Sequence, residues 1–197
     1  MTTPLRKDAA RNWDRIVSVA RTLVDRGEPL QLNDVARRTG VGVGTVYRHF
    51  PTPEALLETV AAPCLEDLAV HGEQAMADTD PRRALEGFLL RTVEAQVTDA
   101  SLAPVTAAVT DALPRTTELK HSLRSAGTRL LDRARDAGTV RPDLDAADLV
   151  PLMCGIAHAV DVHGGTPADR IDTARRYLAA FLGGLRTTPP NTAPPNT

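Results

Sequence analysis

Apolar residues recur every three or four positions along most of this 197-residue chain, which is the period of an amphipathic helix. Between Arg6 and Arg26 they fall on one helical face, and Gly27 and Pro29 end that helix. No stretch alternates apolar and polar residues as a strand does. The pattern predicts an all-α fold of about nine helices, and the later ones are expected over residues 80–97, 102–112, 118–137, 145–162 and 167–185.

Proline and capping residues set the expected helix boundaries. A helix that begins near Pro53 is predicted to be interrupted at Pro63, because a proline inside a helix kinks or breaks it. Asp80 and Thr166 each precede a proline, an arrangement typical of a helix start with a side-chain cap. Trp13, at helical spacing in the first helix, is predicted to anchor the core rather than to contact a ligand.

Residues 31–57 are the most informative stretch, because they predict two short helices joined by a glycine turn. Gly40 closes the first of these helices in the left-handed region of backbone space. Val41 is placed to pack between the two helices, while Val46 and Phe50, four residues apart, face the core. This layout is that of a helix-turn-helix motif.

The second of these short helices carries the chemistry expected of a DNA reader. Thr45 lies at its start, where unpaired backbone N–H groups attract anions. Tyr47 offers a hydroxyl that can reach a phosphate oxygen, and Arg48 and His49 lie on the same outer side. Helical proteins that do not bind DNA also contain short helices with glycine and charged residues, so the layout alone leaves that alternative open.

Charge is unevenly distributed along the chain. The whole chain has a net charge of −2, yet residues 1–50 hold nine Lys or Arg and five acidic residues, which leaves +4 there and −6 in the rest. A basic head on an acidic body fits a protein that touches DNA at one end. Arg6 and Lys7 are placed to reach the DNA backbone or the minor groove, although a solvated helix face explains them equally well. An aromatic content of 3% argues against a reader of single-stranded RNA, which needs stacking platforms.

Over residues 8–58 the chain resembles the TetR family of bacterial repressors. The resemblance rests on the run Gly-Val-Gly-Val-Gly-Thr-Val-Tyr-Arg-His-Phe-Pro-Thr-Pro-Glu-Ala-Leu-Leu, which begins at Gly40. The family pattern is Ala-Gly-Val-Ser-x-Gly-Thr-Leu-Tyr-x-His-Phe, followed by Lys-Glu-x-Leu at the start of helix four.

Three positions depart from this pattern. Thr39 stands where Ala is usual, and Pro53 stands where many members carry a Lys near the DNA backbone, so that contact is in doubt. Gln31 stands where a Thr often caps helix two, and Asn33 is predicted to take over the cap. The resemblance implies that the DNA-contacting residues are Arg6, Lys7, Gln31, Asn33, Val43, Gly44, Thr45, Tyr47, Arg48 and His49.

The resemblance also implies how the chain is divided. Residues 1–51 are expected to form the helix-turn-helix domain, and residues 52–186 a helical domain for effector binding and dimerisation. The composition of residues 187–197, which are only Thr, Pro, Asn and Ala, predicts a disordered tail. A homodimer would place two heads on a palindromic operator in double-stranded DNA. The last two long helices supply the candidates for the dimer interface, which are Leu149, Leu152, Met153, Ile156, Tyr177, Phe181 and Leu185.

A small-molecule effector of apolar character is the other expected partner. The candidates for its pocket are Met76, Phe88, Gln96, His121, Met153 and His158, although each is explained more simply as ordinary core or surface. His158 and His163 have a weak spacing for a metal site, so neither a metal nor a cofactor is expected. Cys64 and Cys154 are predicted to be small buried apolar residues rather than a disulfide or metal pair.

The sequence thus predicts a ligand-responsive repressor that a small molecule releases from its operator. A polar N-terminus and the lack of a long apolar run predict a cytoplasmic protein without a membrane span. No catalytic motif is present, so an enzyme is not expected. A DNA-binding regulator without an effector is the main alternative, and a helical enzyme is the weaker one. Whether the protein represses or activates depends on the position of the operator.

Overall fold

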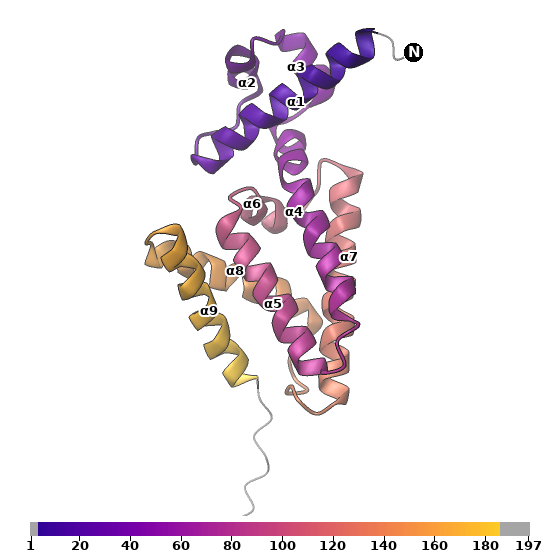
Figure 1. The fold of residues 1–197 in the computed structure, drawn as a ribbon, viewed down its shortest axis with the longest axis vertical. Coiled ribbons are helices and arrows are strands. Elements are labelled where there is room, and N and C mark those ends of the chain that lie inside the picture. Colours follow the sequence, from indigo (N-terminus) through magenta and orange to yellow (C-terminus); the bar gives the residue numbers. More distant parts are fainter. Residues whose placement is uncertain (1–3, 186–197) are drawn as a thin grey trace, which may run out of the picture. The chain divides into compact units, whose positions relative to one another are not determined.

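The computed structural model describes residues 4–185, with side chains from Asp8 onward, and this part of the chain is helical with no strand. The tail predicted over residues 187–197 lies outside it. Figure 1 gives the order of the nine helices of the described residues, which confirms the all-α prediction. They are α1 (Pro4–Asp25), α2 (Leu32–Thr39), α3 (Val43–His49), α4 (Pro53–Ala75), α5 (Pro81–Thr98), α6 (Leu102–Ala107), α7 (Pro114–Asp136), α8 (Ala146–His163) and α9 (Pro167–Gly184). None of these helices is long and apolar enough to cross a membrane.

The chain forms two compact units that are discontinuous in sequence. The first unit comprises Met1–Ala69 and Ala95–Ser122, and the second comprises Val70–Glu94 and Leu123–Thr197. Helices α4, α5 and α7 contribute residues to both units. The three helices of the predicted DNA-binding domain all lie in the first unit, together with α6.

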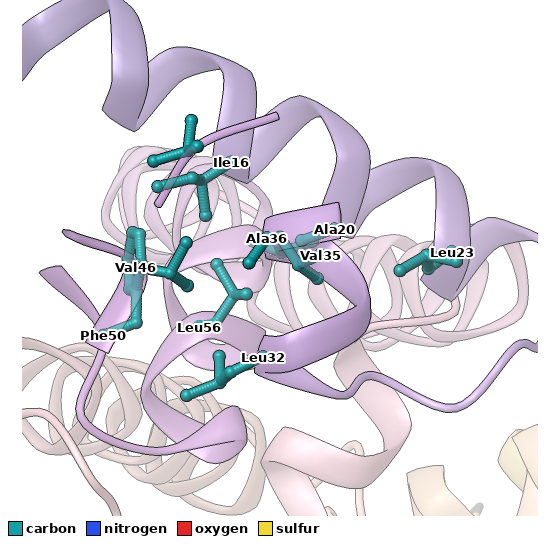
Figure 2. Close-up of a cluster of buried hydrophobic side chains, with 11 residues drawn as sticks. Ile16, Ala20, Leu23, Leu32, Val35, Ala36, Val46, Phe50 and Leu56 are labelled. Atoms are coloured by element: carbon teal, nitrogen blue, oxygen red, sulfur yellow. The ribbon is translucent and has the colours of Figure 1, made fainter. Parts of the chain in front are cut away.

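An apolar cluster holds α1, α2 and α3 together with the start of α4 (Figure 2). Its members are buried side chains that recur at helical spacing, namely Ile16, Ala20, Leu23, Leu32, Val35, Ala36, Val41, Val46, Phe50, Leu56 and Val60. The predictions for Val41, Val46 and Phe50 are confirmed. Burial of each large aliphatic or aromatic side chain contributes about 1.5–3 kcal/mol before the entropy of folding is subtracted.

Trp13 is the exception to the predicted core of this unit. Its ring centroid lies 6.3 Å from that of Phe50, but 39% of the residue stays exposed. The prediction that it anchors the core is therefore wrong, and Trp13 covers the edge of the cluster instead.

The turn between α2 and α3 is closed by Gly40 and Thr39. Gly40 has φ +69°, in the left-handed region that favours glycine. The buried Thr39 hydroxyl donates to the carbonyl of Val35 at 2.8 Å and accepts from the backbone N–H of Val41 at 3.3 Å. The departure from the family's usual Ala thus adds a hydrogen bond across the turn.

The predicted cap of α2 is wrong. The helix begins at Leu32, so Gln31 is the N-cap residue with extended backbone, and its side chain makes no cap hydrogen bond. Asn33 is already inside the first helical turn and is exposed. A side chain in that position cannot reach back as an N-cap side chain does.

Three helix boundaries further along the chain also differ from the sequence prediction. Helix α4 runs through Pro63 without interruption. Pro63 removes one backbone hydrogen bond, but it lies on an exposed side of the helix where water can serve the freed carbonyl. The segment predicted over 102–112 ends at Ala107, and α7 begins at Pro114 instead of near residue 118. A proline at the first helical position is compatible with this earlier start.

Side-chain caps begin the helices of the second unit. The Asp80 carboxylate accepts from the backbone N–H groups of Arg82 and Arg83 at 3.0 and 3.1 Å, as predicted. Thr166 and Asp169 form a capping box in which each side chain accepts from the other's backbone N–H, which confirms the predicted start of α9. Helices α8 and α9 pack against each other.

Candidate nucleic-acid interface

Helix α3 has one buried and one exposed face. Val46 is fully buried in the apolar cluster, whereas Val43 and Tyr47 are 49% and 45% exposed. Gly44 and Arg48 are exposed at the neighbouring positions. Since residues four apart share a face of a helix, positions 43, 44, 47 and 48 form one continuous outer surface. We call these four residues the outer face of α3.

Thr45 and His49 occupy the edges of this surface and are half-buried. The His49 ring lies 6.2 Å from the ring of Phe50, measured between centroids. Phe50 is buried, so His49 is held at the border between the core and the outer face. All six residues predicted from α3 therefore lie on or beside one exposed surface.

Glycines flank Val43 at the start of α3, so Val43 carries the only side chain among residues 42–44. Gly42 is the N-cap residue, and its carbonyl accepts from the N–H groups of Thr45 and Val46 at 2.8 and 3.1 Å. A Cβ atom added at Gly44 would have no neighbour within 4 Å, so open space lies above this position. Another molecule can therefore approach the backbone of this turn closely.

Ion pairs already neutralise the arginines of α2. Arg37 pairs with Asp34, and Arg38 pairs with Glu28 at 2.7 Å and with Asp34 at 2.8 Å. The hydrogen bond that Arg38 donates to Glu28 and the charge of Asp34 raise the pKa of Arg38 above its ordinary value. A phosphate that approached α2 would have to compete with these carboxylates.

Arg48 differs from these arginines. Among the residues that the structure describes, Arg48 has no carboxylate within ion-pair distance. Arg15 also makes no ion pair there, but its guanidinium donates to the carbonyl of Thr39. The uncompensated charge of the outer face therefore resides on Arg48, and this residue is the strongest candidate for contact with an anion or with the acceptor edge of a base.

The remaining DNA candidates lie away from α3 in sequence. Gln31 and Asn33 are exposed at the start of α2. Arg6 and Lys7 belong to the first turns of α1, but their side chains lie outside the described part. The exposure of Trp13 was not predicted from the sequence, because helical spacing alone does not distinguish a residue in the core from one at its edge.

The six pocket candidates do not share one unit. Gln96 and His121 belong to the first unit, and Met76, Phe88, Met153 and His158 to the second. His121 and His158 are exposed, which is the position of a surface residue rather than of a pocket lining. Phe88 is packed between Gly72 of α4 and Gly127 of α7, where an added Cβ would approach the ring to 3.0 and 3.4 Å. Phe88 therefore fills the core of the second unit.

The dimer candidates divide into two groups. Leu149, Met153 and Leu185 are buried within the single chain, so a partner has no surface of these residues to cover. The other four are half-exposed on α8 and α9, namely Leu152, Ile156, Tyr177 and Phe181. The His163 ring meets the Tyr177 ring edge-on at 6.3 Å, which joins the end of α8 to the middle of α9.

The spacing of the histidines and cysteines in the sequence predicts no metal site. No group of three or more His, Cys, Asp or Glu side chains that could hold a metal occurs in the described part of the chain. Cys64 and Cys154 form no disulfide, and both are half-buried, whereas the sequence predicted that they are buried.

Two segments of this chain match families of known proteins. Residues 16–60 match the family described as bacterial regulatory proteins, tetR family. Residues 80–187 match the family described as the C-terminal domain of SbtR-like transcriptional regulators. A curated HTH-type transcriptional regulator of Staphylococcus aureus is 36% identical over 76 residues, which span 38% of this chain and only 41% of that protein.

Solved structures cover nearly the whole chain. A TetR transcriptional regulator from Streptomyces coelicolor is 30% identical, with a TM-score of 0.56, and the match covers 89% of this chain and 99% of the other. A TetR transcription regulatory protein from Mycobacterium vanbaalenii is 31% identical, with a TM-score of 0.52, and the match covers 93% of this chain and 100% of the other.

Proposed function

The chain belongs to the TetR family of transcriptional regulators and is a DNA-binding regulator, and from this premise we propose that it is a homodimeric, cytoplasmic repressor released from DNA by a small molecule. The observation that carries the proposal is the outer face of α3. This surface holds an exposed tyrosine, a glycine, and an arginine that has no carboxylate partner among the described residues.

Each residue of α3 has a proposed task. The Tyr47 hydroxyl and the His49 ring hold phosphate oxygens, which sets the register of the helix on the duplex. Thr45, Val43 and Arg48 lie nearer to the base edges in the major groove. Gly44 lets the start of the helix come close to the DNA. Contacts from Arg6, Lys7, Gln31 and Asn33 to the backbone complete the proposed interface.

A dimer follows from the small size of one head. Seven residues of α3 make few contacts, and two linked heads on one palindrome gain affinity because the second binding event is intramolecular. The half-exposed side chains Leu152, Ile156, Tyr177 and Phe181 are the part of the predicted interface that a partner can cover. We place the two-fold contact on these four residues.

The effector is proposed to be small and apolar, because the buried residues of the second unit are almost all apolar. A regulator without an effector remains the second candidate. The exposure of His121 and His158 favours this second candidate, because it removes two polar side chains that could hydrogen-bond an effector in a pocket.

The experiment that tests the proposal measures binding to labelled duplexes from the region upstream of the protein's own gene, at two salt concentrations. Arg48→Ala is compared with Arg37→Ala, since both arginines are exposed but Arg37 is already paired with Asp34. Arg48→Ala is expected to lower the affinity about fivefold or more, and Arg37→Ala by less than about twofold. Equal losses in the two variants would refute the assignment of Arg48.

The same measurement examines the wider proposal. A stoichiometry of two chains for each selective site supports the dimer, and one chain for each site contradicts it. Release of the DNA by an apolar compound found in a thermal-shift screen supports the effector. Failure of every stabilising compound to alter DNA binding would favour the regulator without an effector.

A further inference from the structure

We propose that Val43 recognises the 5-methyl group of a thymine in each operator half-site. The inference rests on the proposed function, because it specifies what one residue of the outer face of α3 reads. Val43 is the first residue of α3, and 49% of it is exposed. The glycines on either side of it carry no side chain, so Val43 alone projects from the start of the helix.

The fold gives Val43 no structural task. The apolar cluster is completed by Val41 and Val46, which are 7% and 0% exposed, and Val43 is not a member of it. An exposed β-branched residue is also a poorer helix former than alanine. Stability therefore does not account for a valine at this position.

The chemistry of the valine side chain restricts what it can read. It has neither a donor nor an acceptor, so it gains nothing from the polar edges of guanine, cytosine or adenine. In the major groove the thymine methyl is the one apolar group that a base presents, and apolar side chains read it by contact. The polar residues Thr45, Tyr47 and Arg48 are left to make the hydrogen bonds.

Space around Val43 makes such a contact feasible. A Cβ atom added at Gly42 would meet only the Thr45 hydroxyl, at 3.8 Å, and one added at Gly44 would meet nothing within 4 Å. No side chain beside Val43 would hold the helix start away from a base edge. The valine methyls can therefore approach the groove floor closely.

The test replaces each thymine of a selective operator by deoxyuridine, which keeps base pairing and removes only the methyl group. Loss of one methyl contact is expected to weaken binding about fourfold, and loss in both half-sites about fifteenfold. In the wild-type protein one position in each half-site should show this loss. In Val43→Ala the same substitution should change the affinity by less than about twofold.

Two further variants separate the methyl contact from other effects. Val43→Thr keeps the β-branched shape and one methyl group, and it should retain part of the sensitivity to deoxyuridine. Val70→Ala shortens a similarly exposed valine outside α3, which is 56% exposed, and should leave the whole pattern unchanged. Melting curves of the variants check that all of them are folded.

The outcomes are distinguishable. If the wild type binds its operator selectively but no thymine is sensitive, or if Val43→Ala remains as sensitive as the wild type, the role of Val43 is overturned while the proposed function stands. If no duplex is bound selectively, the proposed function fails and the role of Val43 fails with it.

Discussion

Replacement of Glu58 by alanine should destabilise the first unit more than any other single loss of a carboxylate on α4. Glu58 is 3% exposed, and its two carboxylate oxygens accept from the backbone N–H groups of Ala112 and Leu113 at 2.7 and 2.8 Å. These two residues directly precede α7, whose first residue is Pro114. A side chain of α4 thus accepts hydrogen bonds from the backbone just before a helix that begins more than fifty residues later in the sequence.

The size of the effect follows from these two bonds. A hydrogen bond to a charged group contributes about 1.5–3 kcal/mol, and a buried donor left without a partner costs about 1–3 kcal/mol. Ala112 is exposed, so water can replace part of the loss. We expect Glu58→Ala to lower the free energy of unfolding by about 3 kcal/mol, which corresponds to a fall in Tm of about 6–12 °C for a chain of this size. Glu58→Gln keeps one acceptor and should lose about half as much.

Thermal and urea unfolding, followed by circular dichroism, measure this difference. Glu54→Ala is the matched control, because Glu54 lies one turn earlier on α4 and is exposed. Exposed substitutions of this kind usually change stability by less than about 0.5 kcal/mol. If Glu58→Ala unfolds at the same urea concentration as Glu54→Ala, the two backbone hydrogen bonds do not stabilise the unit as argued.

Two further predictions concern one contact in each unit. Arg21 donates to both carboxylate oxygens of Asp99, at 2.7 and 3.2 Å, and the pair is partly buried. A double-mutant cycle on this pair should give a coupling energy of about 1–3 kcal/mol. The same cycle on the exposed pair Arg37–Asp34 is the control and should give less than about 0.5 kcal/mol. Burial opposes ionisation of Asp99, but the hydrogen bonds from Arg21 and Ser101 outweigh it and hold the pKa of Asp99 below its ordinary value. The coupling energy should therefore be fully present above about pH 4 and should disappear as the pH falls through that lowered pKa. In the second unit, Gly72→Ala would put a Cβ 2.9 Å from that of Ala126 and 3.0 Å from the Phe88 ring, and should cost about 1–3 kcal/mol in urea unfolding. Gly87→Ala, which meets nothing within 4 Å, should be neutral or stabilising by up to about 1 kcal/mol, and equal losses in the two variants would contradict the packing argument.

The sequence was sufficient for the features that depend on neighbours along the chain. The glycine at position 40, the apolar spacing of Val46 and Phe50, and the caps at Asp80 and Thr166 act within one or two helical turns. Local chemistry of this kind predicted the all-α fold and the outer face of α3.

Features that depend on the surroundings of a residue were not predictable in the same way. Trp13 has the spacing of a core residue, yet it lies where the cluster ends. Pro63 has the chemistry of a helix breaker, yet it lies on a side of α4 where water can replace the missing bond. Asn33 is a good capping residue, yet the helix had already begun before it. In each case the residue type was informative, and its position relative to the core decided the outcome.

The polar contacts between residues far apart in the sequence of the first unit could not be predicted from the sequence. They also change the role assigned to the arginines of this unit. A count of charges over residues 1–50 treats Arg21 as part of a basic surface for DNA. In the structure its guanidinium bonds Asp99 and also the carbonyl of Val60, at 2.6 Å, so it ties α1 to α4 and to the end of α5. Glu58 makes a comparable tie between α4 and the start of α7. These bonds are directional, and a directional bond is lost over a smaller displacement than an apolar contact. Changes in residues 95–122 can therefore reach α1 without any contact with α3, which is why the Arg21–Asp99 cycle should be measured by operator affinity as well as by unfolding.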